Sequence, residues 1–85
     1  MNIKYFSVRD KKAEAFLTPF TARTDGEAIR SFQDALQDPK SPFFKYPDDF
    51  TLYYVADWND GIGSFVPAVG GARVVVEGMQ FSLNQ

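Results

Sequence analysis

Residues 24–38 read TDGEAIRSFQDALQD, and this stretch decides the fold because it specifies a helix together with both of its ends. Thr24 followed by Glu27 fits a capping box, in which the hydroxyl bonds the backbone three residues on and the carboxylate reaches back to the cap. Asp38 and Pro39 stop the helix, since a residue before proline avoids helical backbone angles. The apolar residues in between recur at helical spacing: Ala28, Ile29, Phe32, Ala35 and Leu36. One amphipathic helix is therefore predicted.

Extended apolar runs before and after this helix predict a sheet. Residues 2–9 are β-prone, and Ile3, Tyr5 and Ser7 point to the opposite side from Lys4, Phe6 and Val8. Residues 15–22 form a weaker extended segment, which Pro19 interrupts and confines to a sheet edge. Residues 51–58 form a strand that is apolar on both faces and is therefore predicted to be central. Its two faces are Tyr53 and Val55 on one side, and Leu52, Tyr54, Ala56 and Trp58 on the other.

Glycine-containing turns organise the rest of the chain. Asn59, Asp60 and Gly61 predict a tight turn that joins the central strand to residues 63–66 in a hairpin. Gly70 and Gly71 form a second break before a strand at residues 73–76. With 85 residues the chain has no room for a second core, so residues 1–85 are predicted to be a single domain. The predicted fold class is α+β, with one helix packed on a small, mainly antiparallel sheet of 4–5 strands.

Cysteine and histidine are both absent. Their absence excludes disulfide frameworks, Cys/His zinc sites, cysteine nucleophiles, Ser-His-Asp triads and imidazole acid–base chemistry together. Asp48 and Asp49 are adjacent, and because neighbours in a turn or strand usually point apart, no shared metal or acid–base site is expected from them. We expect a protein that is not an enzyme and that holds no metal or cofactor. No run approaches the roughly 18 apolar residues of a membrane span, so a cytoplasmic protein without a membrane partner is expected.

Basic residues are concentrated early in the sequence, since residues 1–45 hold eight of the nine. Arg9, Lys11 and Lys12 fall at a predicted loop tip, and Lys4 points outward from the neighbouring strand. A few such cations bind phosphates independently of the base sequence. Residues 40–49 form a loop with two prolines in which lysines alternate with rings, a combination on which unpaired bases stack. The candidate nucleic-acid-binding residues are Lys4, Arg9, Lys11, Lys12, Lys40, Phe43, Phe44, Lys45 and Tyr46.

Each group of candidates also has a plainer explanation. Asp10 and Glu14 lie among the first cations, so a solubilising surface turn is the alternative there. The rings of residues 43–46 are alternatively core side chains beneath the loop, because a small domain needs large rings to fill its interior. For Tyr54 and Trp58, a helix-covered core or a dimer interface is favoured over a platform for nucleotides.

Residues 38–53 read DPKSPFFKYPDDFTLY, and together with two earlier elements they carry a family resemblance. An opening strand ends in the turn Asp10-Lys11-Lys12-Ala13, and the pair Pro19-Phe20 follows. The chain resembles the small nonstructural protein of gokushovirus-type microviruses, which are single-stranded DNA phages. The matching positions of residues 38–53 are Asp38, Pro39, Ser41, Phe44, Lys45, Pro47, Asp49, Phe50, Leu52 and Tyr53. The resemblance covers residues 1–62, and Ala56-Asp57-Trp58 stand where the family has a Gly-Glu-Phe-like element.

The resemblance implies a nonstructural phage protein that is absent from the mature virion and works in the host cytoplasm. It implies a role in viral DNA replication, or in the switch to single-strand synthesis and packaging, through binding of single-stranded DNA. It supplies no catalytic residues and assigns no role to residues 62–85. The alternative is a protein–protein interaction module that contacts a replication, assembly or host protein, or forms a homo-oligomer, with a dimer favoured.

Overall fold

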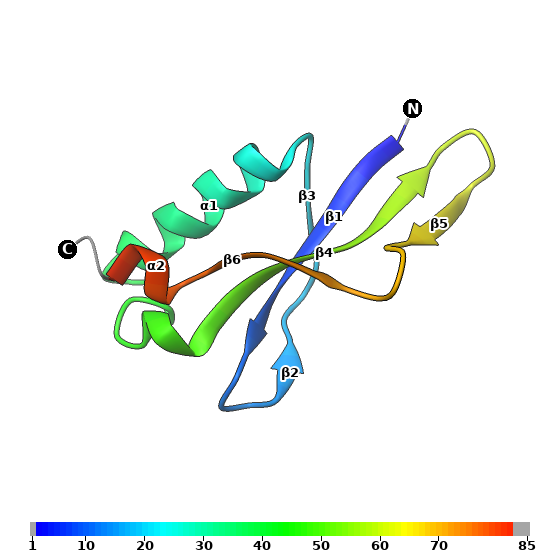
Figure 1. Ribbon diagram of the computed structural model, residues 1–85. Coiled ribbons are helices and arrows are strands. Elements are labelled where there is room, and N and C mark those ends of the chain that lie inside the picture. The colour runs from blue at the N-terminus through cyan, green and yellow to red at the C-terminus, as the bar shows by residue number, and fades with distance from the viewer. Residues whose placement is uncertain (1, 83–85) are drawn as a thin grey trace.

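The computed structural model describes residues 2–82, which form a six-stranded antiparallel sheet with a long helix on one of its faces (Figure 1). The sheet is the larger part, so the structure is mainly β, whereas the sequence predicts the α+β class. In chain order the elements are β1 Asn2–Asp10, β2 Ala15–Phe16, β3 Phe20–Ala22, α1 Asp25–Gln37, the 3₁₀ turn η1 Pro47–Asp49, β4 Phe50–Asn59, β5 Ser64–Pro67, β6 Arg73–Glu77 and α2 Met79–Ser82.

The sheet is organised around two long central strands. β1 and β4 pair antiparallel along their whole length, from Asn2 opposite Asn59 to Asp10 opposite Phe50. Two short strands, β2 and β3, share the outer edge of β1, and β5 and β6 share the outer edge of β4. The helix on a mainly antiparallel sheet is confirmed, and so is the central position of β4. The predicted number of 4–5 strands is wrong, because the segment around Pro19 leaves β1 and divides one edge strand into two.

Helix α1 begins where its capping sequence predicts. The Thr24 hydroxyl accepts a hydrogen bond from the Glu27 backbone N–H at 3.1 Å. The Glu27 carboxylate accepts from the backbone N–H of Arg23 at 3.1 Å, one residue before the predicted partner. Because both hydrogen bonds of the capping box form, backbone N–H groups at the start of the helix that have no partner within it are satisfied. The short helix α2, which follows β6, was not predicted.

The core lies between α1 and the face of the sheet beneath it. Phe6 and Leu52 lie on neighbouring strands and have no exposed surface. Phe32 packs against them from the middle of the predicted helical stripe. The complete buried cluster is Phe6, Val8, Ala28, Phe32, Leu36, Phe50 and Leu52. The helical spacing and the strand alternation therefore converge on one apolar layer, as the sequence predicts.

A β-bulge divides β4 into two parts with opposite alternation. Phe6 pairs with Tyr54, whereas its neighbour Tyr5 pairs with Ala56, so Val55 is the extra residue. An inserted residue moves every later side chain of that strand to the other face. The prediction that Ala56 and Trp58 share a face with Leu52 and Tyr54 is therefore wrong.

The hairpin between β4 and β5 is confirmed, with its glycines used differently from the prediction. The Asn59 side chain accepts from the Gly61 backbone N–H at 2.9 Å, and Gly63 donates to the Asn59 carbonyl at 2.9 Å. It is Gly63 that adopts a positive φ of 65°, a conformation that costs glycine little. The tip of the hairpin therefore depends on a glycine just beyond the predicted turn.

Candidate nucleic-acid interface

The nine predicted binding residues do not form one surface. Lys4 lies on the helix-covered side, where its ammonium group is 3.8 Å from the Asp25 carboxylate and 5.9 Å from the centre of the Tyr54 ring. Both partners belong to the protein itself. Lys4 is therefore a link between β1 and the start of α1, and its assignment to a DNA-binding surface is not supported by its position.

Phe43 is a core residue, as the alternative interpretation of the loop predicts. Its ring centre lies 4.4 Å from that of Phe50 and 6.3 Å from that of Phe32. Phe43 is only partly exposed and packs against the buried cluster. The loop after α1 thus uses its first ring to cover the end of the core, which leaves Phe44 and Tyr46 as the rings available to a ligand.

Four of the predicted residues do come together at one end of the sheet. The backbone N–H of Lys11 donates to the Asp49 carbonyl at 2.8 Å, which fixes the β1–β2 turn beside η1. Lys12 and Tyr46 line one shallow hollow of about 350 Å³, and Lys45 and Tyr46 line another of about 330 Å³. We call Lys11, Lys12, Lys45 and Tyr46 the basic end. The Tyr46 side chain is 62% exposed.

Acidic groups lie close to the basic end. The Asp10 carboxylate accepts from the backbone N–H groups of Lys12 and Ala13 at 2.9 and 3.3 Å, so it serves its own turn. Asp10 and Asp49 line the hollow that Lys12 shares with Tyr46, and Asp48 and Asp49 line the hollow that Lys45 shares with it. In the part of the chain that the structure describes, no three acidic groups gather in a way that could hold a metal ion.

The remaining predicted residues lie around this end. Lys40 and Phe44 are exposed in the same loop, and the Lys40 backbone N–H donates to the Asp38 side chain at 2.9 Å. Arg9 pairs with both Phe16 and Thr51 across the sheet, so its side chain belongs to the face that α1 does not cover. Arg9 therefore connects the basic end to that uncovered face.

The uncovered face carries an aromatic and aliphatic surface that the sequence did not reveal as a unit. Cross-strand pairing places its residues in rows, such as Ile3, Trp58 and Phe65 at one end and Tyr53 with Val74 nearer the other. We call this surface the open face; it consists of Ile3, Tyr5, Phe16, Tyr53, Trp58, Phe65 and Val74. Its rows could not be read from the sequence, because the bulge at Val55 changes which residues share a face.

Rings on the open face contact one another edge to face. The centre of Phe65 lies 5.2 Å from that of Tyr5 and 4.9 Å from that of Trp58. Phe16 and Tyr53 form a second pair at 5.0 Å. Such T-shaped pairs stabilise by about 0.5–1.5 kcal/mol beyond their buried area. The rings are thus ordered by each other, while half of the Phe65 side chain, 53%, remains exposed.

Tyr54 occupies the opposite, helix-covered side and is the centre of a polar network. Its hydroxyl donates to the Asp57 carboxylate at 2.6 Å, and its ring lies between Lys4 and the Arg73 guanidinium, which is 5.1 Å from the ring centre. Arg73 also donates to Asp25 at 3.3 Å. The hydrogen bond to Asp57, followed by burial and the negative charge of Asp57, raises the pKa of Tyr54 to about 12.

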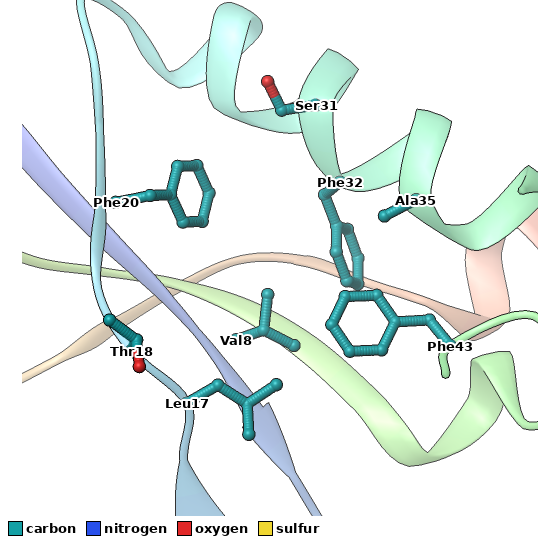
Figure 2. Close-up of a pocket in the computed structure, with 8 residues that line it drawn as sticks. All are labelled: Val8, Leu17, Thr18, Phe20, Ser31, Phe32, Ala35 and Phe43. Atoms are coloured by element: carbon teal, nitrogen blue, oxygen red, sulfur yellow. The ribbon is translucent and has the colours of Figure 1, made fainter. Parts of the chain in front are cut away.

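An apolar hollow of about 360 Å³ opens between α1 and the segment that joins β2 to β3. Figure 2 shows Phe20, Phe32 and Phe43 converging on it with Val8 and Leu17, while the hydroxyls of Thr18 and Ser31 point away from its centre. Leu17 is still held to β1, since its backbone N–H donates to the Val8 carbonyl at 2.8 Å, and the hollow opens beside residues 17–18 in the gap between the two short strands. It carries no charged group and therefore offers hydrophobic contact alone.

Comparison with known proteins identifies the chain as one of a family of small bacteriophage proteins. It belongs to the Phage ORF5 protein family, whose model matches residues 3–81. Protein ORF5 of Chlamydia phage 1 is 30% identical over 88 residues, which cover 99% of this chain and 92% of that protein. No solved structure matches significantly. The resemblance to the small protein of gokushovirus-type phages is confirmed, and it extends beyond residue 62 through β5 and β6.

Proposed function

We propose that this chain is a non-enzymatic phage protein that binds single-stranded DNA at the basic end and acts in viral DNA replication, or in the switch to single-strand synthesis and packaging, in the host cytoplasm. The observation that carries the proposal is the position of Tyr46. The residue is 62% exposed and lines two hollows, one shared with Lys12 and the other with Lys45.

The chemistry of these side chains suits an unpaired strand. Lysine ammonium groups neutralise phosphates regardless of base sequence. An exposed ring stacks with a base only when that base is free of its complement, and each such contact is worth about 1–3 kcal/mol. Tyr46, with Phe44 two residues earlier, offers such rings next to the cations. The combination supports a preference for single strands over a duplex.

A role by contact rather than by catalysis is supported by composition. The chain has no cysteine and no histidine, the side chains that serve most often as nucleophile or as acid–base group near neutral pH. Among residues 2–82, no helix combines the length and apolarity needed to cross a bilayer. The chain belongs to a phage protein family, and the proposal of nucleic acid as its ligand rests on the side chains of the basic end.

The salt dependence of binding tests the proposal. Fluorescence anisotropy of a labelled oligothymidine is titrated at 50 and 200 mM salt. Three phosphate contacts give a slope of about −2 in log affinity against log salt, so affinity falls roughly 20-fold. Replacement of Lys11, Lys12 and Lys45 by Glu abolishes this binding, whereas Arg30→Glu, an exposed charge reversal on α1, leaves most of it. Equal losses in both variants would show that only overall charge matters.

The ring contribution is tested at Tyr46. Tyr46→Ala lowers affinity at least fivefold and Tyr46→Phe restores it, because the stacking surface is retained. A duplex of the same length, titrated in parallel, binds more weakly and does not respond to Tyr46→Ala. An unchanged affinity of Tyr46→Ala for the single strand, with folding verified by circular dichroism, would remove the ring from the proposed interface.

A further inference from the structure

The open face carries large apolar side chains that no part of the described chain covers. Phe65 and Val74 are 53% and 49% exposed, and Ile3 and Phe16 are 41% and 47% exposed. We infer that a second copy of this chain covers the open face, in a two-fold symmetric dimer. This inference is independent of DNA binding, because it uses the face opposite α1 and none of the side chains of the basic end.

The chemistry of the open face suits protein better than nucleic acid. Aliphatic Ile3 and Val74 stand among the rings, and they contribute hydrophobic burial rather than base stacking. Rings with few charges are typical of the centre of a protein interface. The charged side chains on this face are Arg9 and Glu77, which cancel each other, so the face does not attract a polyanion.

The arrangement of these two charges makes the face complementary to itself. Arg9 and Glu77 flank Thr51, one on β1 and the other on β6. A two-fold axis that runs along β4 within the interface exchanges the two edges of the sheet. Arg9 of each copy then faces Glu77 of the other, and Ile3 faces Phe65 in the same way. Self-complementarity of one patch is the requirement for a symmetric dimer.

The exposed area indicates the strength of such a dimer. An aromatic side chain buries about 150–250 Å² in full, so Phe16 and Phe65 at half exposure contribute on the order of 200 Å² per copy. Ile3, Val74 and the remaining rings add to this and approach the low end of specific interfaces, which is about 500–600 Å² per partner. A dissociation constant in the micromolar range is therefore expected for the dimer. Burial of additional apolar surface in a dimer suits a chain this short, because a small domain buries little of its own surface.

The first test uses the wild-type chain. Sedimentation velocity from 1 to 500 µM shows a shift from monomer to dimer. Trp58, the single tryptophan, lies on the open face beside Phe65, so acrylamide quenching of its fluorescence falls over the same concentration range. A chain that is monomeric at 500 µM overturns the inference. So does a dimer that leaves Trp58 as accessible as it is in the monomer, or protection of Trp58 by an oligonucleotide in the monomer.

Charge exchange tests which partner occupies the face. Arg9→Glu places two acids opposite each other and Glu77→Arg places two arginines opposite each other, so each variant alone dimerises roughly tenfold more weakly or worse, since like charges oppose association. An equal mixture of the two variants regains association, because the carboxylate introduced on β1 of one copy then faces the guanidinium introduced on β6 of the other. Failure of the mixture to associate better than either variant alone contradicts the proposed arrangement.

Removal of the apolar contact completes the design. Phe65→Asp yields a monomer at all concentrations, while Ile62→Asp, at the hairpin tip outside the open face and 69% exposed, dimerises like the wild type. Circular dichroism establishes that both are folded. If Phe65→Asp does not fold, Val74→Lys takes its place and gives the same monomer. An equal loss in Ile62→Asp, or no loss in the face variants, overturns the inference.

Discussion

The two faces of the sheet differ in how far their large apolar side chains are covered. On the helix-covered face, Phe6 and Leu52 have no exposed surface. On the open face, Phe65 and Val74 keep about half of theirs. In β4 the consecutive residues Tyr53 and Tyr54 belong to opposite faces, and both are partly buried.

This contrast shows that apolar alternation is necessary for a core but does not decide where the core forms. The covered face is closed by α1, whose Phe32 and Leu36 are almost completely buried. Among residues 2–82 there is no second helix of that length, so the open face is left to water or to a partner. Burial is therefore a property of the layer above a strand as much as of the strand itself.

The largest expected difference between the faces is in the cost of deleting a side chain. Leu52→Ala lowers the free energy of unfolding by about 2–5 kcal/mol, because it leaves a cavity in the covered layer. Val74→Ala on the open face lowers it by less than about 1 kcal/mol, since the side chain is already half exposed. Urea denaturation of both variants measures the difference. Equal costs would mean that the open face is covered as well.

Gly78 closes the covered side where β6 meets η1, and we expect the next largest effect there. A Cβ at this position would lie 2.0 Å from the Pro47 carbonyl oxygen and 2.8 Å from that of Phe50. Because both obstacles are backbone atoms, Gly78→Ala displaces η1 and destabilises by about 2–3 kcal/mol. Gly26→Ala is the control, since its Cβ meets only the Thr24 side chain at 3.7 Å. Thermal unfolding of the control is unchanged or slightly raised.

Tyr54 and Tyr53 give a smaller and pH-dependent contrast. Tyr54→Phe removes the hydrogen bond to Asp57 and lowers stability by about 1.5 kcal/mol, whereas Tyr53→Phe changes it little. The pKa of Tyr54 is about 12 in the folded protein against about 10 in an unfolded chain. Its stabilising contribution is therefore complete below pH 10 and is lost as the pH rises from 10 towards 12. Urea titrations from pH 8 to 12 should show a flatter profile for Tyr54→Phe than for the wild type.

Thr51, like Ser7, is buried although it lies on the uncovered side. Its replacement gives the smallest effect, and one of opposite sign. Its side chain is 3% exposed, and its hydroxyl is buried without a hydrogen-bond partner. Thr51→Val keeps the shape and removes the unsatisfied group, so it stabilises by about 1 kcal/mol. A rise in the urea midpoint with an unchanged slope would support this. A loss of stability would mean that the hydroxyl is hydrogen-bonded in solution.

The candidate interface was predictable only in part. Lys12, Lys45 and Tyr46 were selected by residue type, and the structure brings them together because the Lys11 backbone is tied to Asp49 across the β1–β4 pair. Phe43 has the same residue type as Phe44, yet it fills the end of the core. Nothing in the local sequence distinguishes the two rings, because burial depends on the helix packed above them.

The sequence by itself determined the elements: a capped amphipathic helix, two long apolar strands, their turns, and a family resemblance carried by residues at fixed spacing. These depend on interactions between near neighbours in the chain. Only the tertiary structure decided which face of the sheet is covered, on which face the bulge at Val55 places Trp58, and that Lys4 lies beside Asp25. Those outcomes depend on contacts between residues distant in sequence, and no local pattern encodes them.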